Sequence, residues 1–107
     1  MKLCYISGKY FGETNDETYE NIQIARKAAV MLWCKGWAVI CPHLNTAFMD
    51  GIVPLETFLQ GDFEMVSRCD AVFMLPNWQD SKGAKREREC AYGAMKPVHY
   101  LEWEDVK

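Results

Sequence analysis

The sequence predicts a small doubly wound α/β domain, with a parallel sheet of about four strands and helices on both faces. Four short apolar segments, each almost uninterrupted, alternate with longer segments of helical periodicity. Unbroken apolar runs are typical of parallel strands covered on both faces, and right-handed crossovers place the intervening helices on both sides of the sheet. The expected strands are Leu3–Ser7, Trp37–Cys41, Ala71–Leu75 and Val98–Leu101.

The first helix is expected between the first two strands, over about 20 residues. Thr14 and Glu17 form a Thr-x-x-Glu capping box at its start, and Gly36 marks its end. Apolar residues at helical spacing predict its buried stripe. They are Ile22, Ala25, Ala29, Leu32 and Trp33.

The second helical segment is expected over Pro54–Arg68, with its proline in the first turn. Gly61 interrupts the apolar period, so we expect a break there, with Asp62 capping a second short helix. The last helix is expected to begin near Ser81 and to end at Gly93.

The composition indicates one domain over residues 1–107, half apolar and one quarter charged. Twelve Lys and Arg against fifteen Asp and Glu give a net charge of −3, and the one basic cluster is Lys82–Arg88. A polymeric nucleic acid would require a larger basic surface, so none is expected as a partner. The apolar stretches are too short to span a bilayer and no signal peptide is recognisable, so we expect a cytoplasmic protein with no membrane partner.

The cysteine pattern argues against disulfides and metals. The number of cysteines is odd and no two are spaced as Cys-x-x-Cys. Cys41 and His43 offer two ligands where structural zinc needs four. We therefore expect reduced thiols that behave as small buried hydrophobes, no metal site and no cofactor. The cysteines are Cys4, Cys34, Cys41, Cys69 and Cys90.

Polar and aromatic residues follow three of the predicted strands. Doubly wound folds bind ligands outside the carboxyl ends of their strands, which makes these loops the candidate site. Neither G-x-x-x-x-G-K-[ST] nor G-x-G-x-x-G occurs, so standard ATPase and dinucleotide sites are not supported. The candidate ligand-binding residues are Gly8, Lys9, His43, Asn45, Trp78, Ser81 and Gly83.

Three of these residues have a purely structural alternative. Ser81 opens a helix whose free N–H groups suit an anion such as phosphate, or it is only the helix cap. His43 is either a general base or a hydrogen-bonding loop residue. Trp78 either stacks on a base or covers the core.

Glu87 is the most informative acidic residue. It is three residues after Ala84 and four before Ala91, on a small-residue stripe expected to face the sheet, whereas Arg86 is expected to project elsewhere. A carboxylate on a buried stripe is costly unless paired, and such residues are often functional. The alternative is a boundary residue paired with Arg88 or a lysine.

The order and spacing of these motifs resemble the nucleoside 2-deoxyribosyltransferase superfamily, which includes the 2′-deoxynucleoside 5′-monophosphate N-glycosidases. The resemblance implies a flavodoxin-like or Rossmann-like fold, and it is greatest to the small phage and bacterial members. The matching motifs are Tyr5-Ile6-Ser7-Gly8, Cys41-Pro42-His43, Asp62, Leu75-Pro76-x-Trp78 and Ser81-x-Gly83-x-x-x-Glu87.

The resemblance implies three catalytic roles. Glu87 matches the nucleophilic glutamate, which attacks C1′ of the sugar and forms a glycosyl-enzyme intermediate that water or a second base resolves. Asp62 matches the aspartate that contacts the sugar hydroxyls and assists proton transfer. Tyr5 matches the tyrosine that orients the catalytic carboxylate.

The resemblance also implies binding roles and shows one departure. Gly8 lets the backbone approach the ligand, and Ser81 and Gly83 match the phosphate contacts of the N-glycosidases. Transferases tend to have Asp at the Ser81 position, which favours nucleotide hydrolysis here. The N-glycosidases have a phosphate-binding arginine after the first strand, whereas this chain has Phe11, with Lys9 as a nearby point charge.

The sequence thus predicts an enzyme that hydrolyses or transfers the N-glycosidic bond of a (deoxy)nucleoside 5′-monophosphate or nucleoside. The resemblance also implies a homodimer or higher homo-oligomer. Two alternatives stay open: a non-catalytic nucleotide-binding or sensor module on the same fold, and an interaction protein that uses its four Trp residues.

Overall fold

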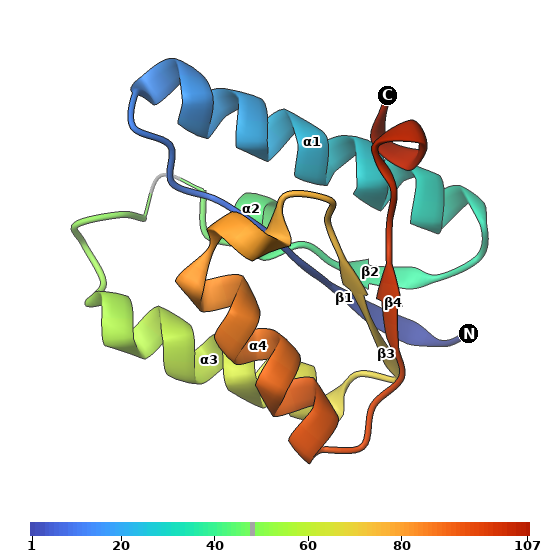
Figure 1. The fold of residues 1–107 in the computed structure, drawn as a ribbon. Coiled ribbons are helices and arrows are strands. Elements are labelled where there is room, and N and C mark those ends of the chain that lie inside the picture. Colours follow the sequence, from blue (N-terminus) through green and yellow to red (C-terminus); the bar gives the residue numbers. More distant parts are fainter. Residues whose placement is uncertain (48) are drawn as a thin grey trace.

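Four parallel strands form the central sheet of the computed structural model, which describes residues 1–47 and 49–107 (Figure 1). Their order across the sheet is β2-β1-β3-β4. The prediction of a small parallel α/β sheet is confirmed, and each strand ends within one residue of its expected bounds. The strands are β1 (Leu3–Ser7), β2 (Ala38–Ile40), β3 (Ala71–Met74) and β4 (Val98–Tyr100).

The helices cover both faces of this sheet. They are α1 (Asn15–Cys34), α2 (Pro42–Asn45), α3 (Leu55–Arg68) and α4 (Lys82–Gly93), with short 3-10 helices η1 (Trp78–Asp80) and η2 (Trp103–Val106). The long α1 covers one face and η2 packs beside it, whereas α3 and α4 pack together on the other face (Figure 1). Among the described residues, none of these helices is apolar over a length that would cross a membrane.

Successive side chains of β1 enter two separate cores. Cys4 and Ile6 pack with the apolar face of α1, and Tyr5 packs on the opposite side with α3 and α4. All three are completely buried. This burial on both faces explains why the strand is an unbroken apolar run rather than an alternating one.

Helix α1 begins where the capping box predicts. The Thr14 side chain accepts a hydrogen bond from the Glu17 backbone N–H at 3.1 Å. The predicted buried stripe is wrong at Trp33, which is 53% exposed, while Ala28 is completely buried. Ala28 is four residues before the buried Leu32 and therefore shares its face, whereas Trp33 is turned about 100° from Leu32.

Helix α3 corrects the predicted break at Gly61. The helix is continuous over Leu55–Arg68, so Asp62 lies in mid-helix and is not an N-cap. Pro54 precedes the helix at the N-cap position instead of lying in its first turn. Gly61 is exposed with open space around it, so continuing the helix through it costs only about 1 kcal/mol. Packing of α3 against α4 outweighs that cost.

The cysteines follow the expectation with one exception. Cys4, Cys41 and Cys69 are buried and Cys90 is half-buried, but Cys34 is exposed. Cys34 lies at the last position of α1, beyond the part of the helix that covers the sheet. The prediction of a buried thiol is therefore wrong there.

The strand order places a binding edge between β1 and β3. From β1 the chain passes through α1 to β2 on one side of β1, and then through α3 to β3 on the other side. Because β2 and β3 are added on opposite sides of β1, the loops that leave β1 and β3 diverge. A crevice therefore opens at the carboxyl ends of these strands.

Candidate active site

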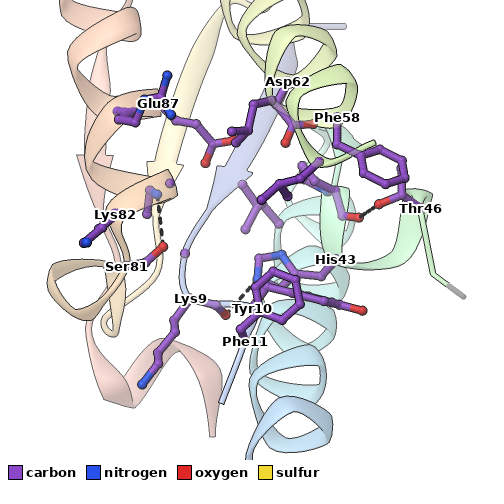
Figure 2. A pocket seen from close by; sticks show the side chains of 18 of the residues that line it. Lys9, Tyr10, Phe11, His43, Thr46, Phe58, Asp62, Ser81, Lys82 and Glu87 are labelled. Carbon is purple, nitrogen blue, oxygen red and sulfur yellow. Dashed lines mark hydrogen bonds between the residues drawn. The ribbon is translucent and has the colours of Figure 1, made fainter. Parts of the chain in front are cut away.

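A cavity of about 430 Å³ lies at this edge. Figure 2 shows α4 with Ser81, Lys82 and Glu87 on one side of it, and Asp62, Phe58 and His43 from the α2–α3 region on the other. The loop after β1 brings Lys9, Tyr10 and Phe11 to the same cavity (Figure 2).

Glu87 lies at the cavity as a buried carboxylate, 7% exposed, on the face of α4 that the small-residue stripe predicts. The Tyr5 hydroxyl donates a hydrogen bond to its Oε2, and the Ser7 hydroxyl donates to its Oε1 at 2.6 Å. The alternative pairing with Arg88 is wrong, because the Arg88 guanidinium donates to the Tyr100 hydroxyl at 2.6 Å. Two hydroxyl groups of β1 therefore hold this carboxylate.

Burial raises the pKa of the Glu87 carboxyl from 4.5 to about 7. The hydrogen bonds from Ser7 and Tyr5 lower this pKa and the nearby Asp62 raises it, but desolvation is the largest cause. Glu87 therefore changes charge close to neutral pH, as a carboxyl group with a chemical role often does.

Asp62 is another carboxyl group that lines the cavity, and it reaches the site from the middle of α3 (Figure 2). Desolvation raises its pKa to about 6, and a hydrogen bond from Tyr5 lowers it in part. The pKa of Tyr5 lies well above 10, mainly because of burial and then because of Glu87. Tyr5 thus stays protonated and is a hydrogen-bond donor between two carboxyl groups.

The start of α4 forms a polar wall of the cavity. The Ser81 hydroxyl accepts a hydrogen bond from the Ala84 N–H at 3.1 Å, so the structural role of helix cap is confirmed. Ser81 and Gly83 also line the cavity, together with Lys82 and Arg86. Arg86 is exposed and lies off the buried stripe of α4, as predicted, and it still lines the cavity. First-turn N–H groups and two cations favour an anion at this end of the site.

The loop after β1 is fixed by two buried side chains. The Lys9 N–H donates to Asn77 Oδ1 at 3.0 Å, and the Lys9 carbonyl accepts from His43 Nε2 at 3.0 Å. Burial lowers the pKa of His43, so its ring is neutral. Its Nε2 proton is donated to the Lys9 carbonyl of the loop. His43 is thus a hydrogen-bonding loop residue that also lines the cavity. A Cβ on Gly8 would lie 2.5 Å from Leu75, so this close approach requires glycine.

Two of the candidate residues are not brought to this cavity. Asn45 is exposed and lies along a separate shallow groove beside Trp33 and Leu44. Trp78 is half-buried against the second core, with Arg88 4.9 Å from its ring centre. The structural alternative for Trp78, a cover over the core, matches this placement.

Ser7 contacts Glu87 at this site, although it is not among the candidate residues predicted from the sequence. It is two residues after Tyr5 in a strand, and side chains two apart in a strand share a face. This spacing from the candidate Tyr5, whose face meets α4, is the signal in the sequence that could identify Ser7. The cavity also has an apolar wall that no motif indicated, made by Leu55, Phe58 and Leu59 of α3.

No group of three or more His, Cys, Asp or Glu side chains within residues 1–47 and 49–107 has the geometry to hold a metal ion.

A family model described as "Domain of unknown function (DUF4406)" matches residues 1–100. No curated protein matches the sequence. Several solved structures match the fold.

A 2-deoxyribosyltransferase from the psychrotolerant bacterium Bacillus psychrosaccharolyticus is 22% identical, with a TM-score of 0.72 over 92% of this chain and 70% of that one. The Clostridium botulinum CMP N-glycosidase BcmB is 18% identical, with a TM-score of 0.64 over 99% and 75%. The solution structure of BlsM is 20% identical, with a TM-score of 0.70 over 98% and 67%. These likenesses confirm the nucleoside 2-deoxyribosyltransferase-like fold.

Proposed function

Because the chain belongs to the family described as "Domain of unknown function (DUF4406)", which assigns no activity, we propose one from its site. The protein cleaves or transfers the N-glycosidic bond of a (deoxy)nucleoside 5′-monophosphate or nucleoside, with Glu87 as nucleophile. The observation that carries this proposal is the buried Glu87 carboxylate, held by Tyr5 and Ser7 at a cavity whose opposite wall bears a second carboxyl group. Two structural neighbours are described as enzymes of nucleoside or nucleotide chemistry, which supports it.

The reaction proceeds in two steps, formation and then breakdown of a glycosyl-enzyme intermediate. A Glu87 oxygen attacks C1′ of the sugar, the bond from C1′ to the base nitrogen breaks, and its electron pair leaves with the base. Water then attacks C1′, the Glu87–C1′ bond breaks, and the sugar leaves with a hydroxyl group at C1′. In a transfer reaction a second base takes the place of water.

Asp62 is the general acid and then the general base, and Tyr5 orients the nucleophile Glu87. In the first step the Asp62 carboxyl protonates the departing base, and in the second its carboxylate takes a proton from the attacking water. Its pKa of about 6 leaves it partly protonated near neutral pH, as this exchange requires. The carboxylate of Asp62 also contacts the sugar hydroxyls.

The cavity walls suggest how the substrate lies. Ser81 and Gly83 at the start of α4 bind the 5′-phosphate, with the charges of Lys82 and Arg86 beside them. The base packs on the apolar side of the cavity, near Phe58. A volume of about 430 Å³ is in the range of small-molecule sites.

The loop after β1 completes this binding site. Gly8 brings the loop backbone to the cavity, and Lys9 supplies a further positive charge where the N-glycosidases have an arginine close to the Phe11 position. His43 holds the loop in place through the Lys9 carbonyl.

The same proposal includes a cytoplasmic homodimer or higher homo-oligomer. Large apolar side chains are exposed around the cavity mouth, namely Phe11 at 60% and Leu55 at 61%, and these suit contact with a second copy. Light scattering on the purified protein measures the oligomeric state, and a monomer at micromolar concentration would refute this part.

The test is release of free base from a panel of nucleosides and their 5′-monophosphates, followed by chromatography. The wild type is expected to release base from at least one of them, and Glu87→Gln is expected to release none. Glu64→Gln on the exposed side of α3 is the matched control and should retain full activity. Binding without turnover by the wild type, unchanged in Glu87→Gln, would instead indicate the sensor module.

A further inference from the structure

Ser7 lies at the end of β1, 1% exposed, and its hydroxyl donates to Glu87 Oε1 at 2.6 Å. We infer that Ser7 is a positioning residue, whose hydroxyl fixes the orientation of the Glu87 carboxylate and favours its charged form. The role in nucleophilic attack rests on the proposed function, whereas the coupling between these two side chains does not.

The two donors of β1 divide the two oxygens of Glu87 between them. Tyr5 donates to Oε2 and Ser7 donates to Oε1. Rotation of the carboxylate about its last side-chain bond would break both hydrogen bonds, although this torsion is otherwise broad. Removing Ser7 as a donor leaves a carboxylate held at one oxygen only.

Ser7 and Tyr5 are not equivalent donors. The Tyr5 hydroxyl has one proton, yet it lies within hydrogen-bonding range of both Glu87 and Asp62. Whenever Tyr5 donates to Asp62, Ser7 is the hydroxyl that remains on Glu87. Among the described residues, Glu87 is the acceptor of the Ser7 hydroxyl, so no second carboxyl group competes for this proton.

Several other groups influence the charge of Glu87. Asp62 on α3 opposes its ionisation, whereas Ser7 and Tyr5 on β1 favour it. Cys90 lies on α4 itself and interacts with the same carboxylate. The remaining charged groups that line the cavity are Lys9, Asp50, Asp80, Lys82 and Arg86.

The pH dependence of base release separates a positioning role from a structural one. A hydrogen bond to a charged group is worth about one pKa unit or more, so Ser7→Ala should raise the pKa of Glu87 by about that amount. The expected result is a kcat/KM about tenfold lower than wild type at pH 6, but within about threefold at pH 8.5. Ser7→Cys fills the same space with a much weaker donor and should give the same pattern.

The control is Ser67→Ala, which removes an exposed hydroxyl that donates to the Glu64 carbonyl far from the cavity. It should match the wild type at both pH values. An equal loss at pH 6 and pH 8.5 in Ser7→Ala and Ser7→Cys, or no loss, would overturn the inference.

A second measurement needs no substrate. The free energy of unfolding of the wild type should fall with rising pH until about pH 7, where Glu87 is ionised. In Ser7→Ala this decrease should continue to a pH about one unit higher. If the fall extends but no substrate releases base, the Ser7–Glu87 coupling stands and the proposed function fails. If base is released but neither the pH profile nor this fall changes, the inference fails and the proposed function stands.

Discussion

Replacing Glu87 with Gln is expected to stabilise the protein at alkaline pH while abolishing activity. Burial raises the pKa of this carboxyl from 4.5 to about 7. Glu87 therefore stays protonated in the folded protein at pH values at which it is ionised in the unfolded chain. Between these two pH values the folded state binds more protons than the unfolded state, and the free energy of unfolding falls as pH rises. Gln is neutral at every pH and has nearly the same shape as Glu. The free energy of unfolding of Glu87→Gln therefore does not fall with pH for this reason.

The magnitude follows from the two pKa values. One pKa unit corresponds to about 1.4 kcal/mol, so the difference between 4.5 and about 7 amounts to about 3 kcal/mol once Glu87 is fully ionised at pH 8. At pH 5 the carboxyl is mostly protonated in the folded state, and less than about 1 kcal/mol has been lost. The stability advantage of Glu87→Gln should therefore grow by about 2 to 3 kcal/mol between pH 5 and pH 8.

Urea unfolding of both proteins at the two pH values measures this change. Glu64→Gln is the control, because Glu64 is exposed in an ion pair with Arg68 and such pairs contribute about 0.5 kcal/mol or less. Its difference from wild type should not vary between pH 5 and pH 8. A pH-independent difference for Glu87→Gln as well would refute a buried carboxyl with a raised pKa.

Three further predictions concern activity and the helices. Base release should be greatest between pH 6 and pH 7 in a pH–rate profile, because Glu87 must lose its proton, with a pKa of about 7, while Asp62 must keep one, with a pKa of about 6. Activity in Asp62→Asn should no longer fall on the alkaline side. Gly83→Ala adds a methyl group that meets only the cap hydroxyl at 3.8 Å, so it should fold normally but raise KM for a 5′-monophosphate about tenfold in steady-state assays. Gly93→Ala, at the far end of the same helix, should leave KM unchanged. Gly61→Ala should raise the free energy of unfolding in urea by about 0.5 to 1 kcal/mol, whereas a loss would mean that α3 is broken there.

The sheet was predictable because its signals are local. Each strand is a short apolar run. Because the strands are buried on both faces, apolar and polar residues do not alternate along them, and the run itself identifies the strand. Glu87 was also predictable, because a charged residue three after Ala84 and four before Ala91 must share their buried face. These inferences need only the geometry of one strand or one helix.

The errors arose where distant contacts decide the outcome. Gly61 is a helix breaker by local preference, but packing between α3 and α4 keeps the helix continuous. Ser7 carries no charge, and although it lies in the Tyr5-Ile6-Ser7-Gly8 motif, its partner Glu87 is 80 residues away in the chain. The placement of Trp78 depends likewise on Arg88 and the second core. No local pattern contains this information.

The central claim is that Glu87 attacks C1′ of a nucleotide or nucleoside. It is tested most directly by the mass of the intact protein after reaction with a nucleotide that carries fluorine at the sugar 2′ position, since this substitution slows breakdown of a glycosyl-enzyme intermediate. The account predicts an added mass of one fluorinated sugar phosphate, located on the peptide that contains Glu87 and absent in Glu87→Gln. Release of base with no adduct, or an adduct on another residue, would contradict it.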